Sequence, residues 1–383
     1  MAPGSKKKKG LKGNPVDKLT DDILADIISR VPYKSTCCCK CVSMRWRDLI
    51  SHPDHRKKMP RSIAGFIYEG YNPRPKKARY FTNVSGKGCH FIDPSLSFLP
   101  KYNSLDILDC CNGLLLCRCW KLTDPNILDY MVCNHATEKW VVVPATDWSS
   151  KAWIARLGFE PAVSSHFHVF EFINDDAWGI NESELRYFDG RLETLAIYSS
   201  KTEVWTLHSV NYGEFAIPLD SRRAFFNGIL HFATFNVSVL AVDVEGNKLV
   251  VDREGNNWSR ISLPSEPHDN WDVNDVFPSQ GRLYFANRTA GSNGSELEIW
   301  VLEDYVTAES WTLKHNVSHL QLFGKKNSLY AEDFSVTSIH PERNLIFIVG
   351  GKYQTLMSYD MDSMKQRFIR QLGSDCRVVC PSA

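Results

Sequence analysis

The first hydrophobic pattern along the chain has the spacing of an α-helix and begins at Leu19. Apolar residues then recur at intervals of three and four, which places them on one stripe of a helix. The members of this stripe are Ile23, Leu24, Ile27, Ile28 and Val31. Thr20 can cap the helix, and Asp21 and Asp22 suit the positive end of its dipole. Pro32 ends the pattern, so the sequence predicts one short amphipathic helix.

Two further short helices are predicted before residue 54. The second starts at Ser35, and the third starts near Ser43 and ends before Pro53. Their apolar positions are Cys38, Val42, Trp46, Leu49 and Ile50. Three short helices in so few residues bury their own apolar stripes poorly, since small domains usually need staples or a partner. We therefore expect this module to dock into a groove of another protein.

The pattern changes at Ile63, where short runs rich in Val, Ile, Phe, Tyr and Trp alternate with turn residues. Such runs are typical of many short antiparallel strands. A turn followed by an apolar strand recurs at residues 112–116, 227–232 and 281–285, with 344–348 as a version without glycine. A second strand follows each of these, at residues 130–133, 240–242, 297–301 and 356–359.

Aromatic residues, usually Trp, recur along this part of the chain. These residues are Trp140, Trp205, Trp258, Trp311 and Phe368, separated by 65, 53, 53 and 57 residues. A recurring Trp at a period of roughly 40 to 50 residues is typical of propeller blades. The sequence thus predicts an all-β propeller of about six or seven blades. A large β-sandwich is the alternative, because the spacing is uneven.

Composition supports a folded protein and divides it into two parts. The 383 residues are 43% hydrophobic and 12% aromatic, and no apolar run approaches the roughly 18 residues of a membrane span. Residues 1–60 hold 14 Lys+Arg against 6 Asp+Glu, whereas the remainder holds 31 against 38. A basic head therefore precedes an acidic body. We expect no membrane partner, and the acidic body argues against a general nucleic-acid binder, since phosphate binding needs clustered Lys and Arg.

The compartment can be inferred from the N-terminus and the cysteines. Lys6–Lys9 has no apolar run behind it, unlike a secretory signal. The 12 cysteines are then expected to be reduced. We expect the protein in the nucleus and/or the cytoplasm and not outside the cell. Whether the lysine run is a nuclear signal stays open.

The head resembles the F-box in its plant form. The motifs that carry the resemblance are Leu19–Leu24, Ile27–Pro32, Lys34–Ser35, Cys41–Ser43 and Arg45–Ile50. The resemblance implies docking onto a Skp-type adaptor, and through it onto a cullin and a RING protein. The implied adaptor-binding residues are Leu19, Ile23, Leu24, Ile27, Val31, Pro32, Val42, Trp46, Leu49 and Ile50. The chain departs from the family at Thr20, usually Pro, and at Cys37–Cys39, usually Leu and Arg, and both departures can weaken docking.

The body resembles the F-box-associated region of plant F-box proteins. The motifs are residues 107–116, 133–140, 156–161 and 297–305, and residues 348–351 with 358–360 are similar to a kelch-type blade. The resemblance implies a substrate-recruiting domain whose loops on one face choose the target. The expected organisation is a disordered basic tail (1–16), an F-box (17–54), a linker (55–62) and a propeller (63–383).

Candidate metal ligands were weighed against packing. Cys37, Cys38 and Cys39 point about 100° apart on a helix and cannot converge on one zinc. Cys117 and Cys119 share a strand face, with Cys133 near them, and His166 and His168 have the same spacing. Free cysteine is among the most buried residue types, so we expect packing there. We assign no metal, no cofactor and no catalytic residue.

The resemblance favours a non-catalytic, substrate-recruiting subunit of a Skp-cullin-F-box (SCF) ubiquitin ligase that directs a target protein to ubiquitination and proteasomal degradation. One alternative is a propeller that binds a ligand or carbohydrate, or acts as an enzyme, with a helical leader. Another is a nuclear protein that contacts nucleic acid through Lys6–Lys9 and Lys12.

Overall fold

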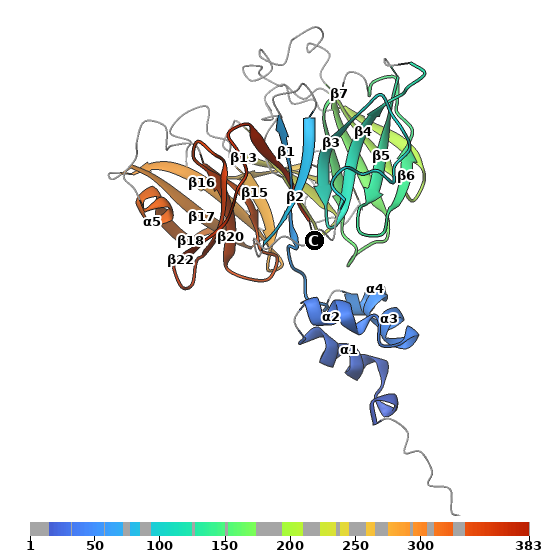
Figure 1. The fold of residues 1–383 in the computed structure, drawn as a ribbon, viewed down its shortest axis with the longest axis horizontal. Coiled ribbons are helices and arrows are strands. Elements are labelled where there is room, and N and C mark those ends of the chain that lie inside the picture. Colours follow the sequence, from blue (N-terminus) through green and yellow to red (C-terminus); the bar gives the residue numbers. More distant parts are fainter. Residues whose placement is uncertain are drawn as a thin grey trace, which may run out of the picture. The chain divides into compact units, whose positions relative to one another are not determined.

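The structure is a computed structural model of the 383-residue chain. It describes residues 15–31, 33–56, 58–71, 77–84, 93–124, 127–149, 152–173, 194–209, 223–234, 238–244, 258–264, 275–291, 294–304, 310–324 and 334–382. The chain divides into two compact units, Met1–Arg61 and Ser62–Ala383, each considered by itself (Figure 1). Within the described ranges, no helix has both the length and the apolar character needed to cross a bilayer.

The first unit is helical. The three predicted helices are α1 (Asp21–Ser29), α2 (Tyr33–Cys39) and α3 (Met44–Ser51). Two further turns were not predicted, the 3₁₀ turn η1 (Pro15–Lys18) and the short helix α4 (Pro53–Arg56). Pro53 ends one helix and starts the next, because a first helical position needs no N–H donor.

Two predicted boundaries differ from the structure. Pro15 and Val16, assigned to the disordered tail, lie in η1, and Val16 packs against the helical core; residues 1–14 lie outside the described residues. The first part of the predicted linker belongs to the helical unit. His55 lies in α4, and Met59 is 7% exposed and packs in the same helical core. Val16 and Met59 stand alone in the sequence, so no hydrophobic pattern predicted their packing in the core.

The second unit is a six-bladed β-propeller, so the sandwich alternative is wrong. In the described residues, five blades have four antiparallel strands and one has three. Blade 1 is β3 (Ser104–Cys111), β4 (Leu114–Trp120), β5 (Leu128–Asn134) and β6 (Lys139–Val143). Blade 2 is β7 (Ala152–Phe159), β8 (Phe167–Ile173), β9 (Thr194–Ser199) and β10 (Val204–Ser209). Blade 3 is β11 (Arg223–Phe226), β12 (Ile229–Thr234), β13 (Ser238–Asp243) and β14 (Trp258–Ser262).

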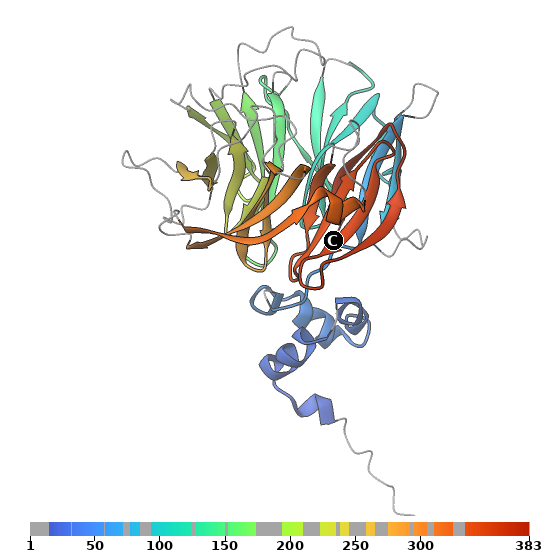
Figure 2. The same ribbon diagram turned by 90° about the vertical axis from the view of Figure 1, so that its left-hand side faces the viewer.

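The remaining blades close the ring. Blade 4 is β15 (Asp275–Ser279), β16 (Arg282–Gly291), β17 (Gly294–Asp304) and β18 (Ser310–Ser318), followed by α5 (His319–Phe323). Blade 5 is β19 (Phe334–Ile339), β20 (Leu345–Gly350), β21 (Thr355–Asp360) and β22 (Lys365–Gln371). Blade 6 joins the two ends of the propeller sequence, because β23 (Cys376–Ser382) pairs with β1 (Gly65–Tyr71), which pairs with β2 (Lys77–Asn83). Figure 2 shows these blue first strands beside the red last strands.

Blade faces form the core of the propeller. Six separate apolar clusters occur among the described residues, and each lies between two neighbouring blades. In β5, for example, Tyr130 and Val132 pack toward blade 2, whereas Met131 and Cys133 pack toward blade 6. Both faces of such a strand are buried, which explains the continuous apolar runs in the sequence.

The aromatic residues that marked the repeat all lie on outer strands, namely β6, β10, β14, β18 and β22. Two of them make the same contact with the preceding blade. The Nε1–H of Trp205 donates to the carbonyl of Pro144 at 2.8 Å, and that of Trp311 donates to the carbonyl of Ser262 at 2.8 Å. In blades 2 and 4 the Trp therefore bonds the outer strand to the end of the preceding blade.

Two-residue turns connect the first and second strands of three blades. Each turn has both residues at positive φ, as in Asn112 (46°) with Gly113 (86°) and Asn227 (53°) with Gly228 (77°). Turns with both central residues at positive φ match the twist of paired strands, and Asn-Gly favours them, which is why these dipeptides predicted a turn before each strand.

Candidate functional site

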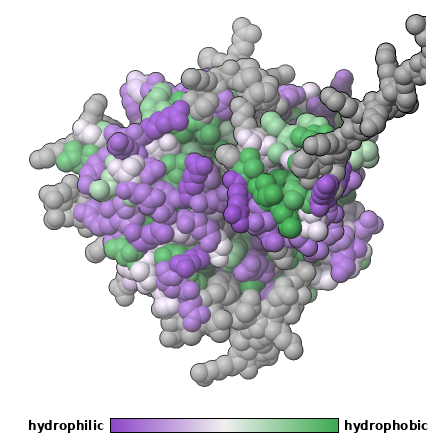
Figure 3. All heavy atoms as spheres, turned by 90° about the horizontal axis from the view of Figure 1, so that it is seen from below, coloured by the Kyte–Doolittle hydropathy of each residue, from purple (hydrophilic) through white to green (hydrophobic). Residues whose placement is uncertain are grey.

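Helix α1 has two adjacent apolar stripes with different surroundings. Leu24 and Ile28 are each 1% exposed and pack in the helical core. Ile23 is 51% exposed and Ile27 is 47% exposed, one turn apart on the neighbouring stripe. The helical unit therefore buries the stripe of Leu24 and Ile28 in its own core and leaves the stripe of Ile23 and Ile27 exposed to solvent. On the face of the molecule in Figure 3, hydrophobic residues gather in compact areas bordered by hydrophilic ones.

Exposed apolar residues continue at the start of α3. Val42 is 64% exposed and Met44 is 70% exposed. Single exposed apolar residues are normal on a soluble protein, but four within so small a unit are candidates for contact with a partner.

Arg45 links the start of α3 to the start of α1. Its Nε and Nη2 donate to one carboxylate oxygen of Asp21 at 3.0 and 2.8 Å, and Nη2 also donates to the carbonyl of Leu19 at 2.6 Å. The ion pair is more than one-third exposed, so its contribution to stability is modest. Its geometric effect is to hold the N-terminal end of α1 against α3.

The helix starts differ in their capping. The Ser43 hydroxyl accepts a hydrogen bond from the Trp46 N–H at 3.2 Å and caps α3. Thr20 occupies the cap position of α1 in an extended conformation, without a side-chain cap bond. Thr20 therefore starts the helix at the predicted place but adds no capping hydrogen bond.

The cysteine segment ends α2. Cys38 is exposed, whereas Cys39 is half-buried against the helical core, where burial and the neighbouring Cys38 raise the pKa of its thiol. The Cys37 side chain lies outside the described part of the chain. One of the unusual cysteines thus replaces a core residue and another faces solvent.

Four cysteines of the propeller are buried in one apolar cluster. Cys117, Cys119 and Cys133 are at most 1% exposed in the cluster between blades 6 and 1, together with Cys380. Burial raises the pKa of Cys119 to about 12, which keeps this thiol protonated at neutral pH. Among the described residues no group of three or more potential ligands is placed to hold a metal ion.

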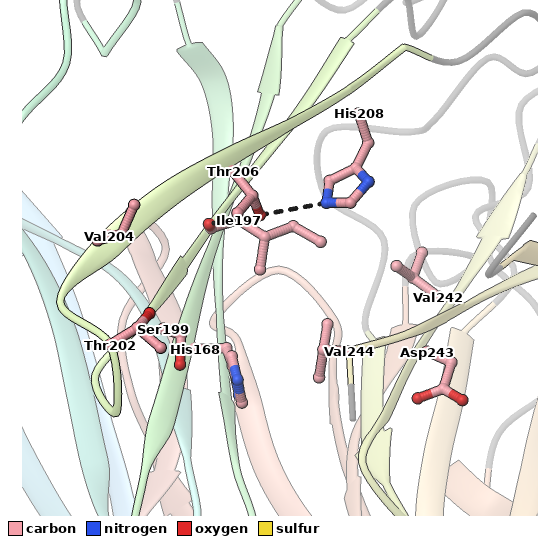
Figure 4. Close-up of a pocket in the computed structure, with 10 residues that line it drawn as sticks. All are labelled: His168, Ile197, Ser199, Thr202, Val204, Thr206, His208, Val242, Asp243 and Val244. Carbon is pink, nitrogen blue, oxygen red and sulfur yellow. Dashed lines mark hydrogen bonds between the residues drawn. The ribbon is translucent and has the colours of Figure 1, made fainter. Parts of the chain in front are cut away.

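A cavity between blades 2 and 3 was not predicted from the sequence. It has a volume of about 290 Å³ and is lined by His168, Ile197, Ser199, Thr202, Val204, Thr206, His208, Val242, Asp243 and Val244 (Figure 4). His168 was expected only to pack, and it does lie near the Phe170 and Phe225 rings. The other lining residues are spread over 47 positions of sequence, so no local motif could reveal them.

Two family profiles match the chain and together span both units. The F-box domain profile matches residues 16–58, and the profile "F-box protein At3g26010-like, beta-propeller" matches residues 89–379. The chain belongs to this F-box β-propeller family. The match covers most of the chain, and the resemblance of both parts to plant F-box proteins is confirmed.

The relatives with similar sequences are F-box proteins of Arabidopsis thaliana. The F-box protein At5g07610 is 26% identical over 78% of this chain and 70% of its own length. The F-box protein At3g07870 is 23% identical over 83% of this chain and 76% of its own length. A solved puromycin-hydrolyzing peptidase of Mycobacterium tuberculosis superposes with a TM-score of 0.38 at 9% identity, over 69% of this chain and 37% of that chain. That score is too low to carry an argument about fold or function.

The residues predicted to bind an adaptor fall into three groups in the F-box. Ile23, Ile27 and Val42 are exposed, and Leu19, Val31 and Trp46 are half-buried. The third group, Leu24, Leu49 and Ile50, is at most 6% exposed and forms the core, so these side chains hold the fold instead of facing a partner. Pro32 lies outside the described residues. Met44 is exposed beside Val42 and was missed, because an unbranched apolar residue at a helix start carries no periodic signal.

Proposed function

We propose that this F-box protein is the substrate-recruiting subunit of a Skp-cullin-F-box ubiquitin ligase. Its F-box binds a Skp-type adaptor, and its propeller holds a target protein for ubiquitination and proteasomal degradation. The observation that carries the proposal is an F-box whose Ile23 and Ile27 stay exposed on one stripe beside a fully packed core.

The exposed stripe provides the energy for docking. Burying an Ile side chain is worth about 1.5–3 kcal/mol when it goes from water to a packed interface. Ile23, Ile27 and Val42 are each roughly half exposed or more, so a partner groove can gain part of that energy from all three. The buried Leu24 and Ile28 hold α1 in the helical core, and this orientation leaves Ile23 and Ile27 at the surface.

The propeller acts as a receptor and not as an enzyme in this proposal. Holding a target beside the ligase raises its effective concentration at the ubiquitin-transfer site, and no group of this chain takes part in bond making. Closure of the ring by β23 and β1 gives the rigid frame that such positioning requires.

The protein is proposed to work in the nucleus or the cytoplasm. Its ten described cysteines are all free thiols, including exposed Cys38 and Cys41. Free exposed thiols suit a reducing compartment, where the ubiquitin system also operates.

The test is a comparison of captured partners with proteasome function blocked. The intact chain is compared with a variant carrying Ile23→Asp and Ile27→Asp, which alters only exposed positions. We expect both to retain the same targets, but ubiquitin to accumulate on those targets only with the intact chain. Equal ubiquitin on targets held by both chains would contradict the proposal.

A further inference from the structure

Strand β22, the outer strand of blade 5, carries an unusual concentration of positive charge. It holds Lys365, Arg367 and Arg370, all exposed, and no acidic residue. The outer strands β6, β10, β14 and β18 of the other four-stranded blades hold at most one Lys or Arg each. Because the body of the chain is acidic as a whole, this basic strand differs from its surroundings.

The pairing of β22 with β21 places the three cations on one face of the blade. They lie opposite alternate residues of β21, namely Leu356, Ser358 and Asp360. Leu356 packs in the cluster between blades 5 and 6, so the cationic face is the one turned toward blade 6. Phe368 lies opposite Met357 instead and faces blade 4. The strand is therefore basic on one face and aromatic on the other.

The groups around the cationic face leave its charge available. Asp360 is the acidic residue of β21, and its carboxylate accepts the N–H of Ser363 at 2.8 Å and that of Asp362 at 3.1 Å in the turn. On blade 6, Tyr80 is 39% exposed and stacks on Tyr68, with ring centroids 5.2 Å apart. Phenol hydroxyls can donate to an anion, so the tyrosines add to a surface suited to carboxylates.

The outer edge of β22 can receive an extended chain. Within the described part of the propeller, β22 pairs with β21 alone. Charged residues often protect such an edge from other strands. Here, however, Met364 is 67% exposed at the start of the strand and Phe368 is 64% exposed within it. Large exposed apolar side chains do not protect an edge, and they suit contact with a partner strand.

We propose that β22 binds an extended acidic segment of a target protein as an added strand. Acidic side chains at every second position lie beside Lys365, Arg367 and Arg370, and the side chains between them contact Phe368. In strand addition, main-chain hydrogen bonds provide affinity and alternate side chains provide specificity. A polynucleotide lacks the peptide groups that pair with a strand edge. That the segment belongs to a target rests on the proposed function, but its binding does not.

Titration of the purified full chain with short peptides tests the proposal. The probe is acetylated and amidated Glu-Val-Glu-Val-Glu-Val. One control, Glu-Glu-Glu-Val-Val-Val, has the same composition without alternation, and the other, Gln-Val-Gln-Val-Gln-Val, has no charge. We expect the alternating acidic peptide to bind about tenfold more tightly than either control, since opposite charges directly across a strand pair attract. Equal binding of all three, or no binding up to about 10 mM, would overturn the proposal.

Two further probes test strand addition itself. Peptides N-methylated at every Glu or at every Val each lose an alternate set of backbone donors, and one set points toward the strand edge. At least one methylated peptide should bind about tenfold more weakly, and strand addition is wrong if neither does. Single-stranded oligouridylate tests a different polyanion. Weaker binding of this oligonucleotide than of the acidic peptide supports the proposal, and tighter binding overturns it.

Charge reversal locates the site. Lys365→Glu with Arg370→Glu should weaken the acidic peptide by about tenfold or more, and the milder Lys365→Gln with Arg370→Gln protects the test against a folding defect. Lys139→Glu with Lys201→Glu, at exposed positions of blades 1 and 2, changes the net charge equally and is the matched control. Unchanged binding by both β22 variants, or an equal loss in the control, would contradict the assignment. No adaptor is present in these titrations, so their failure is distinct from a failure of adaptor docking.

Discussion

Neighbouring residues of α1 with similar chemistry have opposite roles. Ile23 is 51% exposed, and Leu24 next to it is 1% exposed. The spacing of apolar residues in the sequence placed both on one stripe. Consecutive residues lie about 100° apart around a helix, and a pattern of intervals of three and four residues does not resolve that difference. Which part of a broad stripe faces the core depends on where α3 packs against α1, and residues of the two helices that meet there, such as Leu24 and Leu49, are far apart in the sequence.

The division between core and surface predicts different costs for truncation. Leu24→Ala should destabilise the helical unit by about 2–5 kcal/mol, since it leaves a cavity in a small core. Ile23→Ala should cost less than about 1 kcal/mol, because its side chain is half in water already. Amide hydrogen exchange of residues 21–29 in the full chain measures both. Similar loss of protection in the two variants would contradict the assignment of Leu24 to the core and Ile23 to the surface.

Buried histidines make the stability of the propeller depend on pH. Burial lowers the pKa of His231 to about 4, against 6.5 for an ordinary histidine, and His340 is lowered to about 4 by burial and by Arg343. The unfolded chain takes up protons near pH 6.5, whereas the folded one does so only near pH 4. Stability should therefore be full above pH 6.5 and fall as the pH drops toward 4.

A substitution isolates one of these groups. His231→Gln keeps a side-chain donor but cannot titrate, so the unfolding free energy of this variant should change less between pH 6.5 and pH 4. The difference for one histidine is at most about 3 kcal/mol. Denaturant unfolding at several pH values measures it, and a slope identical to that of the unaltered chain would exclude the assignment.

At the scale of elements, the repeat was predictable and its closure was not. Apolar runs, Asn-Gly turns and a recurring Trp identified the second, third and fourth strands of most blades, because two buried faces and a fixed turn leave a local signal. Pairing of β1 with β23 joins residues more than 300 positions apart and leaves no local signal. The sequence alone therefore did not decide between six and seven blades.

The role of the recurring Trp can be tested by removing its N–H. Trp205→Phe and Trp311→Phe each remove a hydrogen bond to the preceding outer strand and should each destabilise the propeller by about 0.5–1.5 kcal/mol beyond the change in ring size. Trp140 is 41% exposed, so Trp140→Phe is the matched control and should have a smaller effect. Thermal unfolding measures the stability of these variants. A larger loss of stability from Trp140→Phe would contradict the role assigned to the hydrogen bonds of Trp205 and Trp311.

Close packing between blades makes a second prediction. A Cβ on Gly158 of β7 would lie 2.6 Å from the Phe225 ring of blade 3, which is closer than real contacts allow. Gly158→Ala should therefore destabilise the propeller by about 1–3 kcal/mol. Adding Phe225→Leu should restore part of the loss in the double variant. Additive losses in thermal unfolding would mean that this contact is not the cause.

At the scale of the whole molecule, the asymmetry of charge corresponds to two units with different folds. The basic head contains the F-box and the acidic body is the propeller, and the boundary of the two compact units falls at Arg61. Family motifs predicted this division, whereas the cavity between blades 2 and 3 needed the folded ring. Its lining converges from two blades, and residues such as His168 and Asp243 lie 75 positions apart.

Docking of the exposed stripe of the F-box onto a Skp-type adaptor can be measured by calorimetric titration of the purified chain with the adaptor. Arg30→Ala serves as a control at an exposed polar position. We expect one-to-one binding by the unaltered chain and by the control. We expect at least about a hundredfold weaker binding for Ile23→Asp with Ile27→Asp, because two apolar contacts of about 1.5 kcal/mol or more are lost. Equal affinity of the double variant, with its helical unit folded, would rule out docking through this stripe.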